Sequence, residues 1–214
     1  MIRVKVVRYL LLIAVVASCN SRSATSEQFV KDGRQYVRVR KYYDDGVLKT
    51  IATLREVGDT FLVDGIVEEF DQNGNTINIR SFVNGVMSGS AYYYKDGGAI
   101  EAYEFYDPEE KLFYKATFTG KKIEEEQGAV FPIIALHPYQ PDDSVRIYAV
   151  NMPYRERNLI IRNRVNSKDT ILYISKWKAD FIDLHKEIIY DTVAISLEYI
   201  SDSGNLLSDS LMLP

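Results

Sequence analysis

The chain contains one cysteine, Cys19, and the residues before it suit a chemical processing step. Cys19 directly follows Val16 and the small residues Ala17 and Ser18. Small residues at these positions are typical of the sites that signal proteases cleave. Because there is no second cysteine, an intramolecular disulfide and a thiolate metal site are both excluded. The thiol of Cys19 is therefore expected to react during processing and not in redox or metal chemistry.

Residues 1–18 have the three parts of a secretory signal peptide. Arg3, Lys5 and Arg8 give a positive start, and Tyr9 to Val16 is an unbroken apolar run. A helix that spans a bilayer needs about 20 apolar residues, so this run is too short to be one. A charged start, a short apolar core and a small-residue cleavage site together predict removal of residues 1–18.

The tetrapeptide Val16-Ala17-Ser18-Cys19 resembles a lipobox, the recognition motif of the bacterial lipoprotein signal peptidase. The resemblance implies cleavage before Cys19, diacylation of its thiol and acylation of its new amino group. One acyl chain holds a protein only marginally, whereas two or more anchor it stably. We therefore expect the lipid bilayer to be a partner of this chain through the acylated Cys19.

The charge balance argues against nucleic acid as a partner. The whole chain carries a formal charge of −4, and the leader holds basic residues but no acidic ones, so the processed chain is more acidic still. Affinity for nucleic acid comes mainly from neutralising phosphates with Lys and Arg. An acidic, exported chain is a poor candidate for that role.

No set of residues suggests catalysis, a metal or a cofactor. The two histidines, His137 and His185, lack further ligands at zinc-site spacing. Asp44-Asp45 and Asp142-Asp143 lack the additional oxygen ligands that a calcium loop needs. Gly85 to Gly89 has methionine at its centre, so it is no nucleophile elbow. We expect a non-enzymatic protein without metal or cofactor.

A repeat fills the first half of the mature chain. Aromatic residues precede a glycine-containing turn in three copies, with turn glycines Gly46, Gly74 and Gly97, and a second turn lies at Gly85. Val63-Asp64-Gly65 is interpreted as an echo of that second turn. Asn-Gly and Asp-Gly supply the positive φ angles of two-residue hairpin turns. Each unit is predicted to be a hairpin that buries an aromatic row by stacking, with these candidate residues: Tyr42, Phe70, Tyr93 and Phe105.

The pattern of aromatic pair, Asp/Asn-Gly and small apolar step is similar to the MORN-variant repeat of antitoxin-like repeat proteins, which are common in Bacteroidota lipoproteins. The likeness covers about residues 29–122. It implies an elongated sheet of β-hairpins used for protein or envelope interactions, and it brings no catalytic residues. A lipidated, exported protein would not meet a cytoplasmic toxin, so the toxin-neutralising role does not fit.

Three consecutive tyrosines, Tyr92, Tyr93 and Tyr94, are the candidate binding face within the repeats. In a strand, Tyr93 points to the side opposite Tyr92 and Tyr94, so at least one side packs in the core. The other side could anchor a partner protein or stack on a sugar. Core packing with cross-strand pairing and a binding face both remain open.

The second half alternates apolar and polar residues in short runs. Val193, Ile195, Leu197 and Tyr199 fall on one face of the clearest run. Several short strands at this spacing resemble an immunoglobulin-like β-sandwich without its cysteine pair. Residues 177–188 fit either a helix or a strand, and we favour strand. The whole chain is thus predicted to be all-β, with these parts: signal peptide 1–18, tether 19–28, hairpin repeats 29–127 and β-sandwich 128–214.

The expected function is that of a membrane-tethered, non-enzymatic binding lipoprotein of the bacterial envelope, with a protein or envelope-glycan partner. A structural or assembly factor of an envelope or secretion complex is the alternative, and a glycan hydrolase is a further one. The hydrolase would need two carboxyls facing each other across a cleft. Asn20 is not the aspartate linked to inner-membrane retention, so we expect the outer membrane, facing the periplasm, with surface display open.

Overall fold

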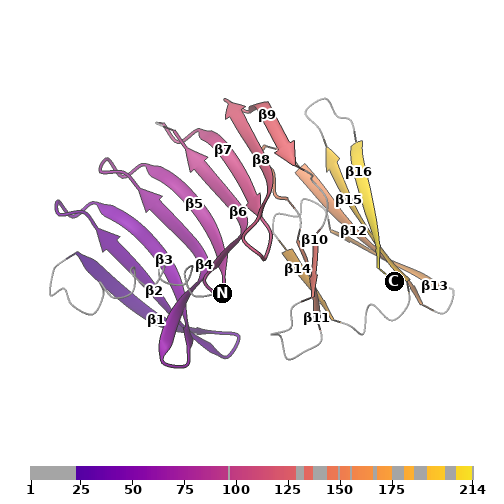
Figure 1. Ribbon diagram of the computed structural model, residues 1–214, viewed down its shortest axis with the longest axis horizontal. Helices are drawn as coiled ribbons and strands as arrows, with labels where there is room; N and C mark the ends of the chain where they lie inside the picture. The colour runs from indigo at the N-terminus through magenta and orange to yellow at the C-terminus, as the bar shows by residue number, and fades with distance from the viewer. Residues whose placement is uncertain are drawn as a thin grey trace, which may run out of the picture. The chain divides into compact units, whose positions relative to one another are not determined.

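The computed structural model describes residues 23–95, 97–128, 133–136, 144–148, 150–154, 156–165, 168–174, 181–185, 192–200 and 206–213. Every helix or strand among these residues is a β-strand, β1 to β16 (Figure 1). The predicted all-β class is confirmed. Cys19 and its motif, Val16 to Ser18, lie outside the described residues.

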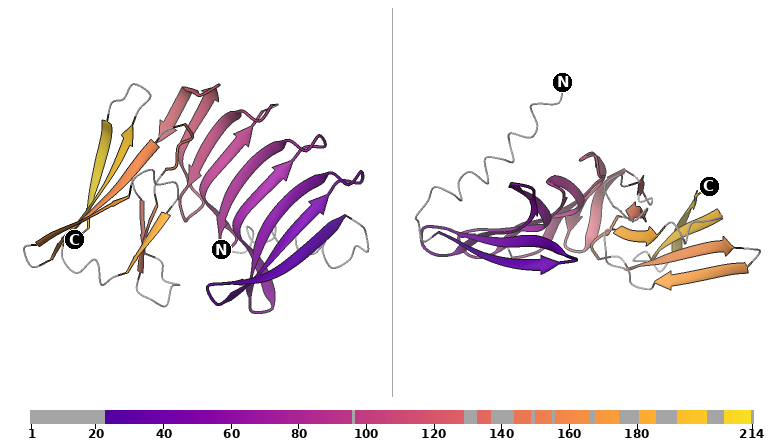
Figure 2. Two further views of the ribbon diagram at one scale, coloured as in Figure 1. Left: turned by 180° about the vertical axis from the view of Figure 1, so that it is seen from behind. Right: turned by 90° about the horizontal axis from the view of Figure 1, so that it is seen from below.

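The first nine strands form one sheet in which each strand lies beside the one before it in sequence (Figure 1). Seen from behind, the hairpins follow one another across the sheet (Figure 2). The strands are β1 Ala24–Lys31, β2 Arg34–Tyr42, β3 Leu48–Val57, β4 Thr60–Phe70, β5 Thr76–Val83, β6 Val86–Tyr94, β7 Ile100–Tyr106, β8 Leu112–Thr119 and β9 Lys122–Gly128. A hairpin array of this kind is what the repeat predicts.

The first strand shortens the predicted tether. β1 begins at Ala24 and pairs with β2 through all eight of its residues. Residues 24–28, expected to be a flexible tether, are therefore part of the sheet. Their polar composition suggested a tether, but it also suits an exposed edge strand. Seven of the eight side chains in β1 are exposed, and Phe29 is half-buried.

Two-residue turns close the hairpins at one set of strand ends. Asp32-Gly33 and Asn84-Gly85 both have positive φ at both residues, which defines a type I′ turn. This turn matches the right-handed twist of the flanking strands. The predicted second turn at Gly85 lies where the sequence placed it.

Five-residue loops join β2 to β3, β4 to β5 and β6 to β7. In each, the first residue donates its N–H to the fifth and its carbonyl accepts the N–H of the fourth. The fourth residues are Gly46, Gly74 and Gly98, all at positive φ. Gly98, and not Gly97, is thus the counterpart of the other two glycines, because the third loop carries two consecutive glycines and the sequence alignment chose the first.

Val63-Asp64-Gly65 is not a turn, contrary to the sequence interpretation. It lies inside β4, where the pairing with β3 shifts between Ala52 and Leu54. Gly65 has φ 125°, and a similar shift opposes Gly89 in β6, which has φ 93°. Both glycines are strand irregularities of the kind that permit a bulge. The matching features of the repeat are therefore Gly65 and Gly89.

The rest of the chain forms two further antiparallel sheets. One has the order β10-β11-β14 and the other β13-β12-β15-β16, so strands alternate between the two sheets along the chain. The bounds are β10 Ile133–Leu136, β11 Ser144–Tyr148, β12 Glu156–Val165, β13 Lys168–Ile174, β14 Phe181–His185, β15 Thr192–Ile200 and β16 Leu206–Leu213. Within the stretch 177–188, for which strand is favoured, residues 181–185 form a strand, and the rest of the stretch lies outside the described residues.

The chain divides into two compact units, each with its own packing. The first runs up to Ala102 and includes Pro108–Glu110, and the second holds Tyr103–Asp107 and the chain from Lys111 onward. The nine-stranded sheet ends at Gly128, one residue after the predicted boundary at 127/128, whereas the compact units divide within β7. No helix in the described part of the chain is long and apolar enough to cross a membrane.

The second unit has the more completely buried core. Tyr103, Phe105, Tyr114 and Ala116 are at most 1% exposed, and they share this core with Tyr148 and Val150. The Tyr103 and Tyr114 rings lie 6.2 Å apart between centroids, within the range of favourable aromatic pairs. The strands β7 and β8 thus carry large aromatic residues, and these are buried in a core shared with the segment that contains Tyr148 and Val150.

Candidate functional site

The predicted aromatic row is not a single buried row. Tyr42 and Phe70 are the last residues of their strands, but Tyr93 and Phe105 each stand one residue before a strand end. Only Phe105 is buried, while the other three are half-buried. The alignment on Gly97 rather than Gly98 shifted Tyr93 by one position, and a shift of one residue moves a side chain to the other face of the sheet.

On one face, the first unit buries small aliphatic side chains together with the ring of Phe82. Val39, Ala52, Val67 and Ala91 are joined through the cross-strand register of β2 to β6, with Arg80 between the last two. We call this side of the sheet the Val39 face. Val39, Val67 and Ala91 are at most 8% exposed. β-Branched and small residues pack closely on a pleated surface.

Arg80 sits within this row because its charge is matched on the same face. Its guanidinium lies 3.0 Å from the Glu69 carboxylate, and its Nε donates to Asn78 Oδ1 at 3.1 Å. Asn78 in turn donates from Nδ2 to Glu69 at 2.6 Å. The guanidinium also lies over the Phe82 ring, 5.9 Å from its centroid. Arg80, Asn78 and Glu69 thus form hydrogen bonds and an ion pair with one another, so we assign this network a role in stabilising the sheet.

The opposite side of the sheet, the Ile51 face, is less well covered. The register aligns Ile51, Glu68, Ile79 and Tyr92 across β3 to β6, and Ile66 and Ile77 lie on the same side of β4 and β5. Ile66 is 50% exposed and Ile77 is 42% exposed. Ile66 pairs with Ser81, four residues from Ile77 along β5, so the two exposed isoleucines are not neighbours, and Glu68 and Ile79 lie between them. Single exposed aliphatic residues are common, but aliphatic side chains that follow one another along one sheet face have the character of an interaction site.

Basic residues border this patch on β2. Arg40 pairs with Ile51 in the register, and Arg38 lies on the same side. The Arg38 guanidinium stands over the Phe29 ring, 5.4 Å from its centroid, and Arg40 lies 3.5 Å from Glu27. An exposed aliphatic patch beside arginine and aromatic side chains has the composition of protein interfaces.

A carboxylate organises the turn end of the first unit. Asp64 Oδ2 accepts the Arg55 Nε–H at 2.6 Å and the Tyr36 hydroxyl at 3.5 Å, and Oδ1 accepts the Asn84 backbone N–H at 3.2 Å. Arg55 also donates to the Asn84 side chain. Burial, followed by the nearby Asp64 carboxylate, raises the pKa of the Tyr36 hydroxyl. These bonds connect the hairpins β1–β2, β3–β4 and β5–β6, and so stabilise the sheet that carries the Ile51 face.

The candidate tyrosines lie at the end of β6. Tyr92 pairs with Ile79 and Tyr93 with Asn78, so Tyr92 belongs to the Ile51 face and Tyr93 to the Val39 face. All three tyrosines, Tyr92, Tyr93 and Tyr94, are half-buried and none is without partners. The structure therefore splits the triplet between two faces: Tyr92 and Tyr94 lie on the side of the isoleucines, and Tyr93 lies on the other side.

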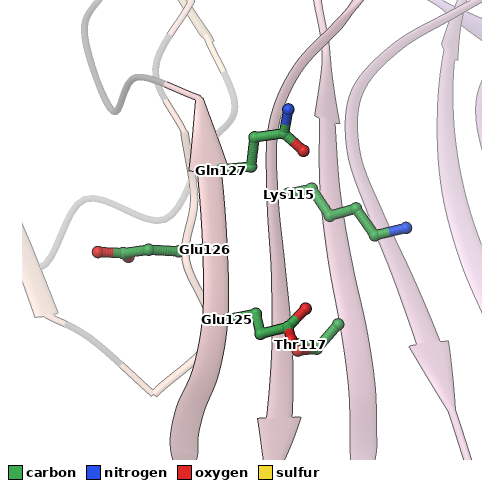
Figure 3. Close-up of a pocket in the computed structure, with 5 residues that line it drawn as sticks. All are labelled: Lys115, Thr117, Glu125, Glu126 and Gln127. Atoms are coloured by element: carbon green, nitrogen blue, oxygen red, sulfur yellow. The ribbon is translucent and has the colours of Figure 1, made fainter.

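A shallow depression lies in the second unit over β8 and β9. Lys115, Thr117, Glu125 and Gln127 point to one side of these strands and Glu126 to the other (Figure 3). Lys115 Nζ donates to Glu104 Oε1 at 2.9 Å, and Glu104 also accepts the Tyr106 hydroxyl at 2.6 Å. Glu104 is 9% exposed, so its partners supply the charge balance that its burial requires.

Acidic residues do not gather into a metal site in the described residues. Asp45 accepts the Val47 backbone N–H at 3.0 Å, which is the use of a turn aspartate. Asp142-Asp143 and His137 lie outside the described residues, and of His185 the structure describes only its place at the end of β14.

The sequence reasoning missed the isoleucine patch and the Asp64 hub. Ile66 and Ile77 lie on different strands, and only the register between β4 and β5 brings them to one face. The alternation of Ile77, Ile79 and Ser81 against Asn78, Arg80 and Phe82 in β5 was a usable signal, because it shows two faces of mixed character.

Comparison with known proteins gives no family. No family model matches the chain, and no curated protein matches it. One similar solved structure is a mutant of S. aureus TarM in complex with Fondaparinux, alpha-GlcNAc-glycerol and UDP, at 12% identity and TM-score 0.29, over 52% of this chain and 20% of that chain. Another is the GtfA/B complex bound to UDP and GlcNAc, at 13% identity and TM-score 0.26, over 58% and 24%. The chain spans about a quarter or less of either, and such TM-scores identify no function for it.

Proposed function

We propose that this chain is a lipid-anchored, non-enzymatic interaction protein of the bacterial envelope, whose partner docks on the Ile51 face. The observation that carries the proposal is the line of isoleucines on the Ile51 face of β4 and β5, in which Ile66 and Ile77 are about half exposed and Ile79 lies between them. Burying exposed apolar surface is the main source of free energy in protein association. Arg38 and Arg40 beside it favour a partner that presents carboxylates next to an apolar surface.

The anchor belongs to the same proposal. The lipobox-like Val16 to Cys19 supports acylation at Cys19, and the MORN-like pattern supports a role in envelope interactions. The strand that begins at Ala24 supports a location near the bilayer, because few residues separate it from Cys19 and each spans at most about 3.6 Å. A partner would then be reached at the membrane, most simply at the periplasmic side of the outer membrane.

The test is chemical crosslinking and affinity capture of the full-length, tagged protein from native membranes. We expect a specific protein that is captured by the wild type and lost with the double variant Ile66→Ser and Ile77→Ser. Leu112→Ser is the matched control, because Leu112 is also an exposed aliphatic residue, 43% exposed, on another strand. Equal capture by both variants, or capture of nothing specific, would rule out the Ile51 face.

A further inference from the structure

Within the part of the chain that the structure describes, β1 is an edge strand of the nine-stranded sheet. β1 pairs with β2 through eight consecutive residues without a register shift, and no other strand of the described residues adjoins it (Figure 1). β1 contains no proline. Its Val30 is 61% exposed, the highest fraction among the exposed large apolar side chains of the described residues.

An edge strand presents a row of unpaired N–H and C=O groups that can pair with another strand. Proteins commonly block such edges with prolines, bulges or very short strands. β1 is eight residues long, contains no proline and pairs with β2 without a bulge, so none of these three features blocks its edge. The charges it carries, Glu27 and Lys31, are of opposite sign, so the strand does not repel a copy of itself by net charge.

We propose that β1 pairs with β1 of a second copy of this chain, in antiparallel orientation, and joins two sheets across a two-fold axis at Gln28. A two-fold axis normal to a sheet places one residue opposite itself and every other residue opposite its mirror position in the strand. The axis at Gln28 therefore sets Glu27 opposite Phe29, Ser26 opposite Val30 and Thr25 opposite Lys31.

Charge favours the register with the axis at Gln28 over the register with the axis at Glu27. An axis at Glu27 pairs as many residues but sets two carboxylates directly opposite each other, which destabilises a strand pair. With the axis at Gln28, two neutral amides meet instead. Side chains directly opposite lie about 4.5–5.5 Å apart between Cβ atoms, close enough for the two amides to hydrogen-bond.

The same register gives Glu27 a cationic neighbour. The Arg38 guanidinium lies over the Phe29 ring on the Ile51 face, and Glu27 lies on that face too. Opposite Phe29 of the second copy, Glu27 would stand beside that copy's Arg38. Glu27 is 57% exposed and its ion pair with Arg40 is long at 3.5 Å, so the carboxylate can accept further hydrogen bonds. The pairing also covers the exposed Val30 with Ser26 of the other copy.

A charge exchange at Gln28 tests the register with the full-length protein in detergent. By sedimentation over a concentration series, we expect wild type to form dimers. Gln28→Glu and Gln28→Lys should each raise the dimer dissociation constant about fivefold, because like charges then face each other. An equimolar mixture of the two variants should dimerise at least as tightly as wild type. Gln28 is exposed in β1, so neither change disturbs the fold.

Disulfide trapping gives a second reading of the same pairing. Two strands paired at Gln28 bring its Cα atoms within the distance that a disulfide bridges, so Gln28→Cys should yield a covalent dimer on mild oxidation. Ser26→Cys is the matched control, since Ser26 is exposed on the same side of β1, but its two copies would lie about 13 Å apart. Wild type measures any background from Cys19.

Three results would overturn the proposal. These are a wild type that stays monomeric at every concentration, a mixture of Gln28→Glu and Gln28→Lys no tighter than either alone, and trapping of Ser26→Cys as fast as Gln28→Cys. None of them bears on partner docking at the Ile51 face, which is tested by different residues.

Discussion

Glu110 has the same left-handed backbone conformation, φ 64°, that Gly74 has at φ 81° in the corresponding loop. The correspondence follows from the hydrogen bonds. Asp71 donates its N–H to Asn75, four residues on, and Asp107 donates in the same way to Lys111. Asp71 Oδ1 and Asp107 Oδ1 also accept the N–H of those same two residues, each at 2.8 Å. The loop after β7 is thus a copy of the loop after β4, with glutamate where the fold favours glycine.

Replacing this glutamate should stabilise the protein. A residue with a Cβ atom in the left-handed region costs roughly 1–2 kcal/mol, whereas glycine adopts it freely. Glycine also has more freedom in the unfolded chain, which offsets about 0.4–1 kcal/mol. Glu110→Gly is therefore expected to raise the free energy of unfolding by about 0.5–1 kcal/mol, measured by urea denaturation followed by circular dichroism.

The adjacent Glu109 provides the control for that change. It is exposed and is not among the residues at positive φ. Glu109→Gly removes no strain and should lower the free energy of unfolding by about 0.4–1 kcal/mol. If both variants are destabilised alike, the strain at Glu110 is absent.

The same loops show what sequence could and could not predict. Gly46, Gly74 and Gly85 were placed in turns correctly, because a turn at positive φ leaves a local signal in residue type. Glu110 gave no such signal, so the loop after β7 was not recognised as a further copy, although it makes the same hydrogen bonds. Residue type could not show whether Gly97 or Gly98 corresponds to Gly46 and Gly74, because both are glycines. The hydrogen bond from the Gly98 N–H to the Lys95 carbonyl identifies Gly98 as the counterpart.

Faces were harder to predict than strands. The alternation in residues 193–199 and the repeat turns located strands well, since period and turn chemistry are local. The isoleucine patch depends on which residue of β4 opposes which residue of β5, and the shift between Glu69 and Phe70 has no counterpart in residue type. Likewise, nothing near Asp64 indicated that Arg55 and Asn84 would converge on it.

Asp71 should make stability depend on pH at the acidic end. Hydrogen bonds from Asn75, first from its side chain and then from its backbone, hold the pKa of Asp71 below its ordinary value, and Asn73 adds to this. A carboxyl whose pKa is lower in the folded state stabilises it above the unfolded value, near 4, and loses that contribution as pH falls through the folded value. Stability attributable to Asp71 is thus complete at neutral pH and declines below about pH 4.

Asp71→Asn isolates this effect, because asparagine keeps an oxygen that accepts backbone N–H groups but carries no charge. The difference in unfolding free energy between wild type and Asp71→Asn should shrink as pH is lowered from 5 to about 2. A difference that stays constant over this range would show that the Asp71 charge contributes nothing.

Two buried tyrosine hydroxyls in the second unit should each be worth measurable stability. The Tyr103 hydroxyl accepts the Asn151 backbone N–H at 2.8 Å, and the Tyr114 hydroxyl donates to Glu126 Oε2 at 2.9 Å. Tyr103→Phe leaves a partly buried N–H without that acceptor and should cost about 1–2 kcal/mol. Tyr114→Phe loses a bond to a charged group and should cost about 1.5–3 kcal/mol. Chemical denaturation of the two variants and of the double variant measures both, and a cost below about 0.5 kcal/mol would contradict the hydrogen bonds.

Loss of the Asp64 charge should loosen the turn end of the first unit. Asp64→Asn weakens the contact with Arg55, whose side chain is only 15% exposed, and should lower the free energy of unfolding by about 1–2 kcal/mol. Asp59→Asn, in an exposed turn, should change it by less than about 0.5 kcal/mol. The pKa of Tyr36 should fall in Asp64→Asn, because the Asp64 carboxylate is, after burial, the largest cause that raises it. Nuclear magnetic resonance of labelled tyrosine would follow that hydroxyl, and an unchanged Tyr36 pKa would remove Asp64 as a cause.

The proposed acylation of Cys19 would determine where these surfaces act. If the cysteine carries the lipid, the wild type should incorporate labelled palmitate and sediment with membranes, whereas Cys19→Ser should do neither. Ser18→Ala is the control, since alanine is also a small residue at the cleavage site and should leave both properties intact. Cys19→Ser should still fold, because the described strands begin at Ala24, and its circular dichroism should match wild type. Palmitate in Cys19→Ser, or wild type found only in the soluble fraction, would show that the chain is not anchored through this residue, and partners would then have to be sought away from the bilayer.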